Sequence, residues 1–218
     1  MGRLTLILGG ARSGKSAMAE RLARQSTGRV TFIATAQPLD EEMQARIAAH
    51  RAARPAHWRT LEESLDLAGA VRSAAESSDL LVVDCLTLWV SNRLCGIGVP
   101  DLAPPVGPSG SGGTLALPLR PPEDLNRLAG GLEAAVGEVV KSVRARDVTA
   151  ILVSNEVGLG LVPDTPMGRV YRDLLGTVNR RFAEDADEVV LMVAGLPLAV
   201  KGVNVPTGTF TGRGPVDG

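Results

Sequence analysis

Short apolar runs alternate along the chain with longer segments in which apolar residues recur at helical spacing. The apolar runs predict strands over Leu4–Leu8, Val30–Ala34, Asp79–Asp84, Thr149–Ser154 and Glu188–Val193. The longer segments predict helices over Ser16–Gln25, Asp40–Arg51, Leu61–Ala75, Glu123–Arg146 and Pro166–Ala183. Strands separated by helices of this length form parallel sheets with right-handed crossovers. We therefore predict an α/β protein with a mostly parallel central sheet flanked by helices.

Two regions interrupt this alternation. Segments 96–122 and 202–218 are rich in Pro, Gly, and Ser or Thr, a composition typical of mobile surface segments. Because strands resume after the first segment, we interpret it as an insertion within one domain that spans residues 1–218, and the second segment as a tail. The insertion would be either a lid on the substrate side or a surface decoration, and we favour the decoration.

The composition excludes several classes of protein. The chain carries 23 basic and 24 acidic residues, and only 3% of its residues are aromatic, which argues against nucleic acid or an anionic membrane as its partner. Two cysteines and two histidines are too few for a disulfide framework or a Cys/His metal site. The first residues lack the pattern of a signal peptide and no apolar run is long enough to span a membrane, so we expect a cytoplasmic protein.

The strongest motif is a phosphate loop that follows the first predicted strand and opens a predicted helix. The GxxxxGK[ST] pattern is formed by Gly9, Gly10, Ala11, Arg12, Ser13, Gly14, Lys15 and Ser16. Glycines let backbone N–H groups point at phosphate oxygens, and the helix N-terminus adds positive potential. Lys15 would contact the β- and γ-phosphates, and the Ser16 hydroxyl would bind Mg²⁺. A plain glycine-rich turn is the alternative, but in this context the motif predicts a P-loop nucleotide-binding (RecA-like) architecture.

Asp84 ends an apolar strand, which is where P-loop enzymes carry a second Mg²⁺ ligand. Its alternative interpretation is an ordinary polar residue at a strand end. The chain has no NKxD motif for guanine, so an ordinary small GTPase is disfavoured. The loop by itself does not distinguish a kinase from a motor ATPase.

Both histidines of the chain, His50 and His57, lie in one arginine-rich segment. Its arginines are Arg46, Arg51, Arg54 and Arg59. Helical spacing places His50 on one inward-facing stripe with Met43 and Ile47, where a histidine is often purely structural. Arginine clusters also bind phosphates, and a neutral histidine beside a triphosphate can attack phosphorus and form a covalent intermediate. The residues alone leave both interpretations open, with His50 a better nucleophile candidate than His57.

Five segments between Leu4 and Lys201 together resemble a known family. They read GGARSGKS, IATAQPLDEEMQARIAAHRAARPAHWRTLE, VVDCLTLWVSN, VSNEVGLGLVP and GRVYRDLLGTVNRRFAEDADEVVLMVAGLPLAVK. In this order they are similar to the bifunctional adenosylcobinamide kinase / adenosylcobinamide-phosphate guanylyltransferase of cobalamin biosynthesis. The first segment is generic, whereas the second and fourth are specific to that family.

The resemblance implies two reactions. A nucleoside triphosphate, ATP or GTP, phosphorylates the aminopropanol hydroxyl of adenosylcobinamide. GMP from GTP is then carried on a histidine and passed to adenosylcobinamide phosphate, which gives adenosylcobinamide-GDP. The resemblance also implies Mg²⁺ as cofactor and a homo-oligomer, a trimer, with nucleotide sites near the subunit interfaces.

By the same resemblance, the guanylylated residue is His50, and Lys15 is its catalytic companion in the phosphate loop. The implied GTP contacts are the eight residues Gly9–Ser16 together with Thr35, Ala36, Gln37, Arg51, Ala52, Ala53, Arg54, Glu62 and Asp84. Asp84 stands where some members carry Glu, and it shares the metal role with Ser16. Segment 96–122 is an addition relative to compact members.

Two alternative functions, and the role of one segment, stay open at this point. The chain could be a phosphate-loop kinase without the guanylyl step, for which His50 would be structural. It could also be a non-catalytic nucleotide sensor or an assembly ATPase. Finally, Asn155–Gly158 follows a buried strand at the carboxyl edge where α/β proteins bind ligands, and it is either a substrate contact or a structural turn.

Overall fold

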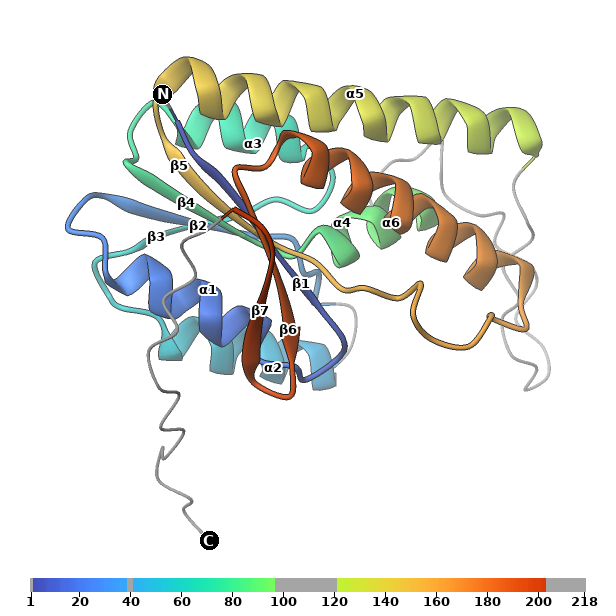
Figure 1. Cartoon of the computed structure of the whole chain (residues 1–218), viewed down its shortest axis with the longest axis horizontal. Coiled ribbons are helices and arrows are strands. Elements are labelled where there is room, and N and C mark those ends of the chain that lie inside the picture. The colour runs from blue at the N-terminus through green and yellow to red at the C-terminus, as the bar shows by residue number, and fades with distance from the viewer. Residues whose placement is uncertain (1, 39–40, 97–120, 203–218) are drawn as a thin grey trace, which may run out of the picture.

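The computed structural model describes residues 2–38, 41–96 and 121–202 (Figure 1). Its elements, in chain order, are β1 (Leu4–Gly9), α1 (Lys15–Arg24), β2 (Val30–Ala34), α2 (Glu41–Ala53), β3 (Arg59–Glu62), α3 (Leu67–Ala74), β4 (Leu80–Asp84), α4 (Leu86–Cys95), α5 (Pro122–Arg146), β5 (Thr149–Val153), α6 (Pro166–Asp185), β6 (Glu188–Val193) and β7 (Leu196–Lys201). The expected insertion at 96–122 and the expected tail at 202–218 lie almost entirely outside the described residues.

All seven strands form one sheet in the order β3-β2-β4-β5-β1-β6-β7. Every neighbouring pair is parallel except β6 and β7, which are antiparallel. The predicted mostly parallel α/β fold is therefore confirmed, with the phosphate loop between β1 and α1 as in the expected RecA-like architecture. Because parallel strands end at the same edge, the carboxyl ends of β2, β4, β5 and β1 lie side by side there.

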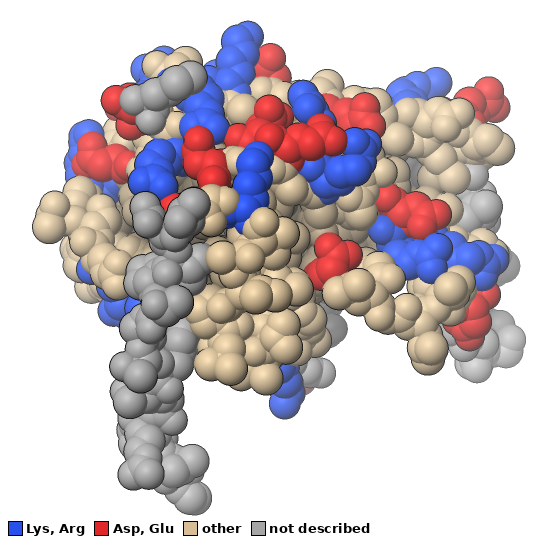
Figure 2. Space-filling model, in the orientation of Figure 1, with Lys and Arg blue, Asp and Glu red and all other residues tan. Residues whose placement is uncertain are grey.

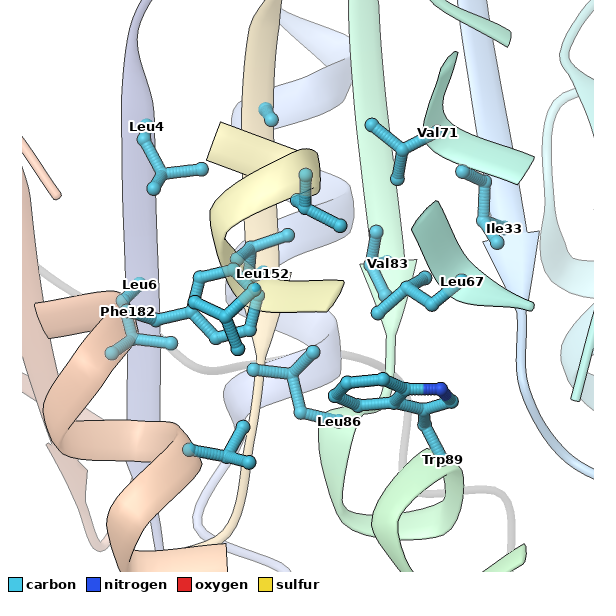
Figure 3. Packing of buried hydrophobic residues seen from close by; sticks show 14 of the residues in the cluster. Leu4, Leu6, Ile33, Leu67, Val71, Val83, Leu86, Trp89, Leu152 and Phe182 are labelled. Atoms are coloured by element: carbon cyan, nitrogen blue, oxygen red, sulfur yellow. The ribbon is translucent and has the colours of Figure 1, made fainter. Parts of the chain in front are cut away.

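Helices cover both faces of the sheet. Helices α3, α4, α5 and α6 lie on one face, and α1 and α2 lie on the other (Figure 1). The core under the larger helical layer is built from aromatic and aliphatic side chains, with Trp89 of α4 and Phe182 of α6 fully buried (Figure 3). A smaller core joins α1 to the opposite face.

The central strands are buried on both faces, as their sequences predicted. In β4, Leu81 and Val83 belong to the core beneath α3–α6, whereas Leu80 and Val82 belong to the core beneath α1. Side chains of a strand alternate between faces, so a strand covered on both sides must be apolar throughout. These strands give the carboxyl edge of the sheet a rigid support.

The predicted helix Leu61–Ala75 is wrong over its first six residues. Residues Arg59–Glu62 form β3, an edge strand parallel to β2, and α3 begins only at Leu67. The Asp66 side chain caps this helix by accepting a hydrogen bond from the Gly69 N–H at 3.0 Å. Helix α4 and strand β7 were likewise not predicted from the sequence.

None of the helices in the described part of the chain combines the length and apolar character that a membrane crossing requires.

Candidate active site

The phosphate loop is fixed by close backbone packing. At Gly9, φ is 152°, and a Cβ atom there would lie 2.6 Å from the Met192 carbonyl oxygen of β6. The Glu156 N–H donates to the Gly9 carbonyl at 3.0 Å, and the Gly195 N–H donates to the Ser13 carbonyl at 3.1 Å. The loop is therefore tied both to the segment after β5 and to the turn of the β6–β7 hairpin.

Gly14 is the N-cap residue just before α1 and has the left-handed conformation, with φ at 93°. As a glycine, Gly14 has no side chain that could accept from the first N–H groups of the helix. Such a helix N-terminus attracts phosphate through its N–H groups and its dipole.

Lys15 is buried within the phosphate loop. Its Nζ donates to the Gly10 carbonyl at 2.5 Å and lies 3.5 Å from Ser13 Oγ. Burial lowers the pKa of Lys15, and electrostatic interactions with Cys85 and Asp84 partly offset that effect. The ammonium is thus held inside the loop, close to where a triphosphate would lie.

Asp84 ends β4 beside the loop. Burial raises the pKa of its carboxyl, while a hydrogen bond with Ser16 and the charges of His50, Arg54 and Lys15 act in the opposite direction. A desolvated carboxylate next to a hydroxyl is the oxygen-donor set that Mg²⁺ uses together with substrate phosphates. Ser16 and Asp84 therefore fit the metal role expected for them. The described residues contain no group of three or more His, Cys, Asp or Glu that would hold a metal by themselves.

These residues meet in a cavity of about 540 Å³ at the carboxyl edge of the sheet. It is lined by Arg12, Ser16, Ala34, Ala36, Pro38, Met43, Ile47, His50, Arg51, Arg54, Glu62, Asp84, Cys85, Thr87, Leu88 and Asn155. The expected stripe on α2 is present, because its three residues, including His50, share this lining. The stripe faces the cavity rather than the core, and His50 is exposed, so the interpretation of His50 as a buried core histidine is wrong.

The arginines of α2 and its C-terminal extension are held in two ways. Arg51 Nη1 lies 3.2 Å from Glu62 Oε1 in an ion pair at the cavity wall. The Arg54 guanidinium lies 3.6 Å from the centre of the Phe32 ring, a cation–π contact. Burial lowers the pKa of Arg54, and Asp84 and other carboxylates partly oppose this. Arg54 is half-buried and Arg51 is exposed, so both guanidiniums can be reached by a ligand beside the phosphate loop.

The structure does not bring every expected nucleotide contact to the cavity. Thr35 is fully buried below it, and its Oγ1 donates to the Cys85 carbonyl at 2.7 Å and accepts from the Cys85 N–H at 2.8 Å. Gln37 donates to Ser64 Oγ at 2.6 Å and is outside the lining. Among the phosphate-loop residues, Arg12 and Ser16 line the cavity.

The remaining expected residues lie elsewhere. Ala52 is exposed outside the lining, and the Ala53 side chain lies outside the described part of the chain, as does that of Arg46. His57 is also exposed but borders a separate hollow with Arg29 and Arg59. The structure thus separates the two histidines, and of the two only His50 shares a cavity with phosphate-loop residues.

Sequence reasoning missed the contribution of α4. Thr87 and Leu88 line the cavity, and Thr87 Oγ1 accepts from the Asn155 N–H at 2.8 Å. Cys85 lines it too, and burial raises the pKa of this thiol to about 11, which keeps it protonated and poorly nucleophilic at neutral pH. Asn155 was considered as a substrate contact, and it does lie at the cavity. An amphipathic pattern directly after Asp84 was the signal for α4, but no turn residue separates it from the strand.

Residues 5–200 match the model of the family described as cobinamide kinase / cobinamide phosphate guanyltransferase. The chain belongs to this family. Three relatives have names that begin with "bifunctional adenosylcobalamin biosynthesis protein". CobP of Pseudomonas aeruginosa is 47% identical over 90% of this chain and 96% of its own length. CobU of Salmonella typhimurium is 36% identical and CobU of Escherichia coli 34% identical, each over 91% of this chain and 99% of its own length. Among solved structures, the RadB recombinase covers 87% of this chain and 74% of its own, with a TM-score of 0.44 and 14% identity.

Membership of the cobinamide kinase / cobinamide phosphate guanyltransferase family makes the protein a transferase. The family description names both a kinase and a guanyltransferase activity, and the names of all three relatives include "bifunctional". None of these names favours a kinase without the guanylyl step. Nucleotide and cobinamide substrates fit this family, and a cavity that joins a phosphate loop to a histidine fits nucleotide chemistry.

Proposed function

We propose that the protein phosphorylates adenosylcobinamide with ATP or GTP and then transfers GMP from GTP, through His50, to adenosylcobinamide phosphate. The product is adenosylcobinamide-GDP. The observation that carries this proposal is the lining of one cavity by Ser16 of the phosphate loop, Asp84 of β4 and His50 of α2. The same cavity supports both reactions, because phosphate-binding groups and a nucleophile face one space.

In the kinase reaction, the chain positions and neutralises the triphosphate. The N–H groups at the start of α1 and the Lys15 ammonium bind phosphate oxygens, which leaves the γ-phosphorus open to the acceptor hydroxyl. The hydroxyl oxygen forms a new bond to the γ-phosphorus, and the bond from that phosphorus to the β–γ bridging oxygen breaks. The hydroxyl proton passes to solvent, and the nucleoside diphosphate leaves. Such an in-line transfer depends on orientation and charge more than on bonds to the protein.

Ser16 and Asp84 are the proposed ligands of Mg²⁺. When bound there, the ion would neutralise charge on the phosphates as it builds up during transfer. The residues themselves supply a hydroxyl and a carboxylate already joined by a hydrogen bond.

In the guanylyl reaction, a ring nitrogen of His50 attacks the α-phosphorus of GTP. The bond from that phosphorus to the bridging oxygen breaks, pyrophosphate leaves, and GMP remains on the imidazole through a P–N bond. A phosphate oxygen of adenosylcobinamide phosphate then attacks the same phosphorus and releases His50. Arg51 and Arg54 flank this position and are suited to stabilise the leaving pyrophosphate.

Two further features belong to this proposal. The protein acts in the cytoplasm, and it forms a homo-oligomer, a trimer, with nucleotide sites near the subunit interfaces. Four apolar side chains of the β6–β7 hairpin support self-association: Val193, Leu196, Leu198 and Val200 are 55–61% exposed. Figure 2 shows that the surface over this hairpin is almost free of charged side chains. Light scattering on the purified protein gives its mass and tests the trimer directly.

A labelling experiment tests the guanylyl step. The protein is incubated with Mg²⁺ and GTP labelled at the α-phosphorus, and the chain is analysed for acid-labile, base-stable label, as a P–N bond requires. We expect label on the wild-type protein and none on His50→Ala.

His57→Ala is the matched control, because His57 is also exposed but lies outside the cavity. It should take up label as the wild-type protein does, and GTP labelled at the γ-phosphorus should leave none. The absence of label on a wild-type protein that binds GTP would rule out the covalent mechanism, as would full label on His50→Ala.

A further inference from the structure

The segment between β5 and α6 exposes three large apolar side chains within four positions. Leu159, Leu161 and Val162 are 79%, 95% and 67% exposed. Scattered apolar residues are ordinary on a protein surface, but several on one short segment indicate a surface that contacts something else. This segment is visible in Figure 1 as the orange loop that leaves β5 and leads into α6.

The segment is anchored at its beginning to the active site. The Asn155 N–H donates to Thr87 Oγ1, and the Asn179 side chain donates to the Asn155 carbonyl at 2.9 Å. The next residue, Glu156, donates its N–H to the Gly9 carbonyl of the phosphate loop. The apolar positions therefore begin three residues after a direct contact with that loop.

The segment is also anchored at its end. Arg169 Nη1 donates to the Pro163 carbonyl at 2.9 Å and to the Asp164 carbonyl at 2.8 Å. Thr165 caps α6 by accepting from the Gly168 N–H at 3.1 Å. Since both ends are tied to the fold, the exposed side chains between them lie on an anchored segment that starts at the cavity, where Asn155 is part of the lining.

The acceptor is too large to fit in the cavity together with the nucleotide, so it needs a binding surface outside the cavity. A cavity of about 540 Å³ lies within the range that holds one small ligand, and the nucleotide occupies it during both reactions. A corrin macrocycle with its axial ligand is larger than a nucleotide, so it must rest outside while its aminopropanol arm reaches inward. The macrocycle carries methyl groups between its amide side chains, and these methyl groups favour contact with aliphatic side chains.

We infer that Leu159, Leu161 and Val162 form the surface on which the corrin ring of the acceptor rests in both reactions. This inference depends on the proposed function, because it assigns a place to the acceptor of that same site. A second copy of the chain is a less suitable occupant, because the β6–β7 hairpin already offers exposed apolar side chains for self-association, whereas this segment begins at the cavity with Asn155.

Binding of adenosylcobinamide tests the inference. The double variant Leu159→Asn/Leu161→Asn replaces two aliphatic side chains by polar ones of similar size. Equilibrium dialysis with a non-hydrolysable GTP analogue present, read by the visible absorption of the corrinoid, should give a Kd at least about tenfold above that of the wild-type protein. The matched variant Leu159→Met/Leu161→Met keeps the apolar contact and should stay within about twofold of the wild-type Kd.

Three results would overturn the inference. One is a wild-type Kd in the asparagine variant, and another is an equal loss of affinity in the methionine variant. The third is a change in molecular mass by light scattering in parallel with the lost affinity, which would make this surface an interface between copies. The proposed function is tested separately by the guanylyl label on the wild-type protein, because that step involves no corrinoid. Failure of the label would thus be distinguished from failure of the corrin surface alone.

Discussion

The two walls of the proposed active-site cavity are built in different ways. The sheet wall carries Ser16 and Asp84 on elements that are embedded in the core, and α1 itself buries four of its residues, Lys15 among them. The opposite wall is α2, whose described side chains are exposed or half-buried and belong to neither core. Packing therefore fixes the phosphate-binding groups, whereas His50 lies on a helix with little packing of its own. Local stability increases with the number of buried contacts. The wall that carries Ser16 and Asp84 should therefore be locally more stable than α2.

The largest effect is expected at the sheet wall, from Gly9→Ala. The added Cβ would lie 2.6 Å from both the Met192 carbonyl oxygen and Ser13 Oγ, at a backbone conformation that favours glycine. We expect the free energy of unfolding in urea to fall by about 3 kcal/mol and GTP binding to be lost.

The neighbouring glycine gives a matched control for that variant. At Gly10 a Cβ would meet nothing within 4 Å, so the unfolding free energy of Gly10→Ala should stay within about 0.5 kcal/mol of wild type. Equal stability of the two alanine variants would mean that close packing does not hold the sheet wall in place.

The next effect concerns the support beneath Asp84. Thr35→Val removes a buried hydroxyl, so the Cys85 N–H loses the acceptor that Thr35 gives it, whereas the Cys85 carbonyl still accepts from the Trp89 N–H. We expect a loss of about 2 kcal/mol in the free energy of unfolding, measured by chemical denaturation. Thr35→Ser keeps the hydroxyl and should lose less, and the reverse order would contradict this account of the sheet wall.

Asp84→Asn should separate stability from activity. The pKa of Asp84 is raised above its ordinary value of 3.8 in the folded protein, so the native state binds more protons than the unfolded chain just above that pH. Stability from this group is therefore full at low pH and is lost as pH rises through the folded pKa. Without Mg²⁺ and nucleotide, Asp84→Asn should be more stable than wild type at pH 7, while phosphoryl transfer falls at least about 100-fold.

The control for Asp84→Asn is Asp79→Asn. The hydrogen bond from exposed Arg29 lowers the pKa of Asp79, so the pH dependence of stability at this residue has the opposite sign. Unfolding midpoints at pH 3 and pH 7 distinguish the two signs. If both asparagine variants shifted the midpoint in the same direction, burial would not be the cause of the Asp84 shift.

The smallest effect on stability is expected on the α2 wall. His50→Ala should abolish the guanylyl label but change the free energy of unfolding by less than about 0.5 kcal/mol, because His50 is exposed. Hydrogen exchange should also be faster at the amides of α2 than at those of α1. Equal protection of the two helices would show that the difference between the walls is only apparent.

The sequence was sufficient for elements whose pattern is strong and local. Apolar runs predicted β1, β2, β4, β5 and β6, because strands covered on both faces have no polar alternative. It failed for β3 and β7, whose side chains are largely exposed and whose pairing is decided by neighbouring strands. It failed for α4 because this helix begins within two residues of β4, with no turn residue to mark the boundary.

The candidate site follows the same division. The phosphate loop and Asp84 could be located from motif and strand position, and helical spacing correctly placed His50 on one stripe with Met43 and Ile47. Spacing could not reveal that this stripe faces a cavity, since that depends on how far α2 lies from the sheet. The Thr35 hydroxyl is likewise bound to a residue 50 positions away, a contact that no local pattern encodes.

The side-by-side strand ends at the carboxyl edge also affect how far the sequences of such proteins can diverge. The phosphate contacts proposed here come from backbone N–H groups and from a few edge positions, so residues inside the sheet need only remain apolar and of suitable size. Interior positions can therefore exchange Leu, Val and Ile over generations without moving the groups that do chemistry. Identity as low as 34% to a relative over nine-tenths of the chain is what such freedom allows.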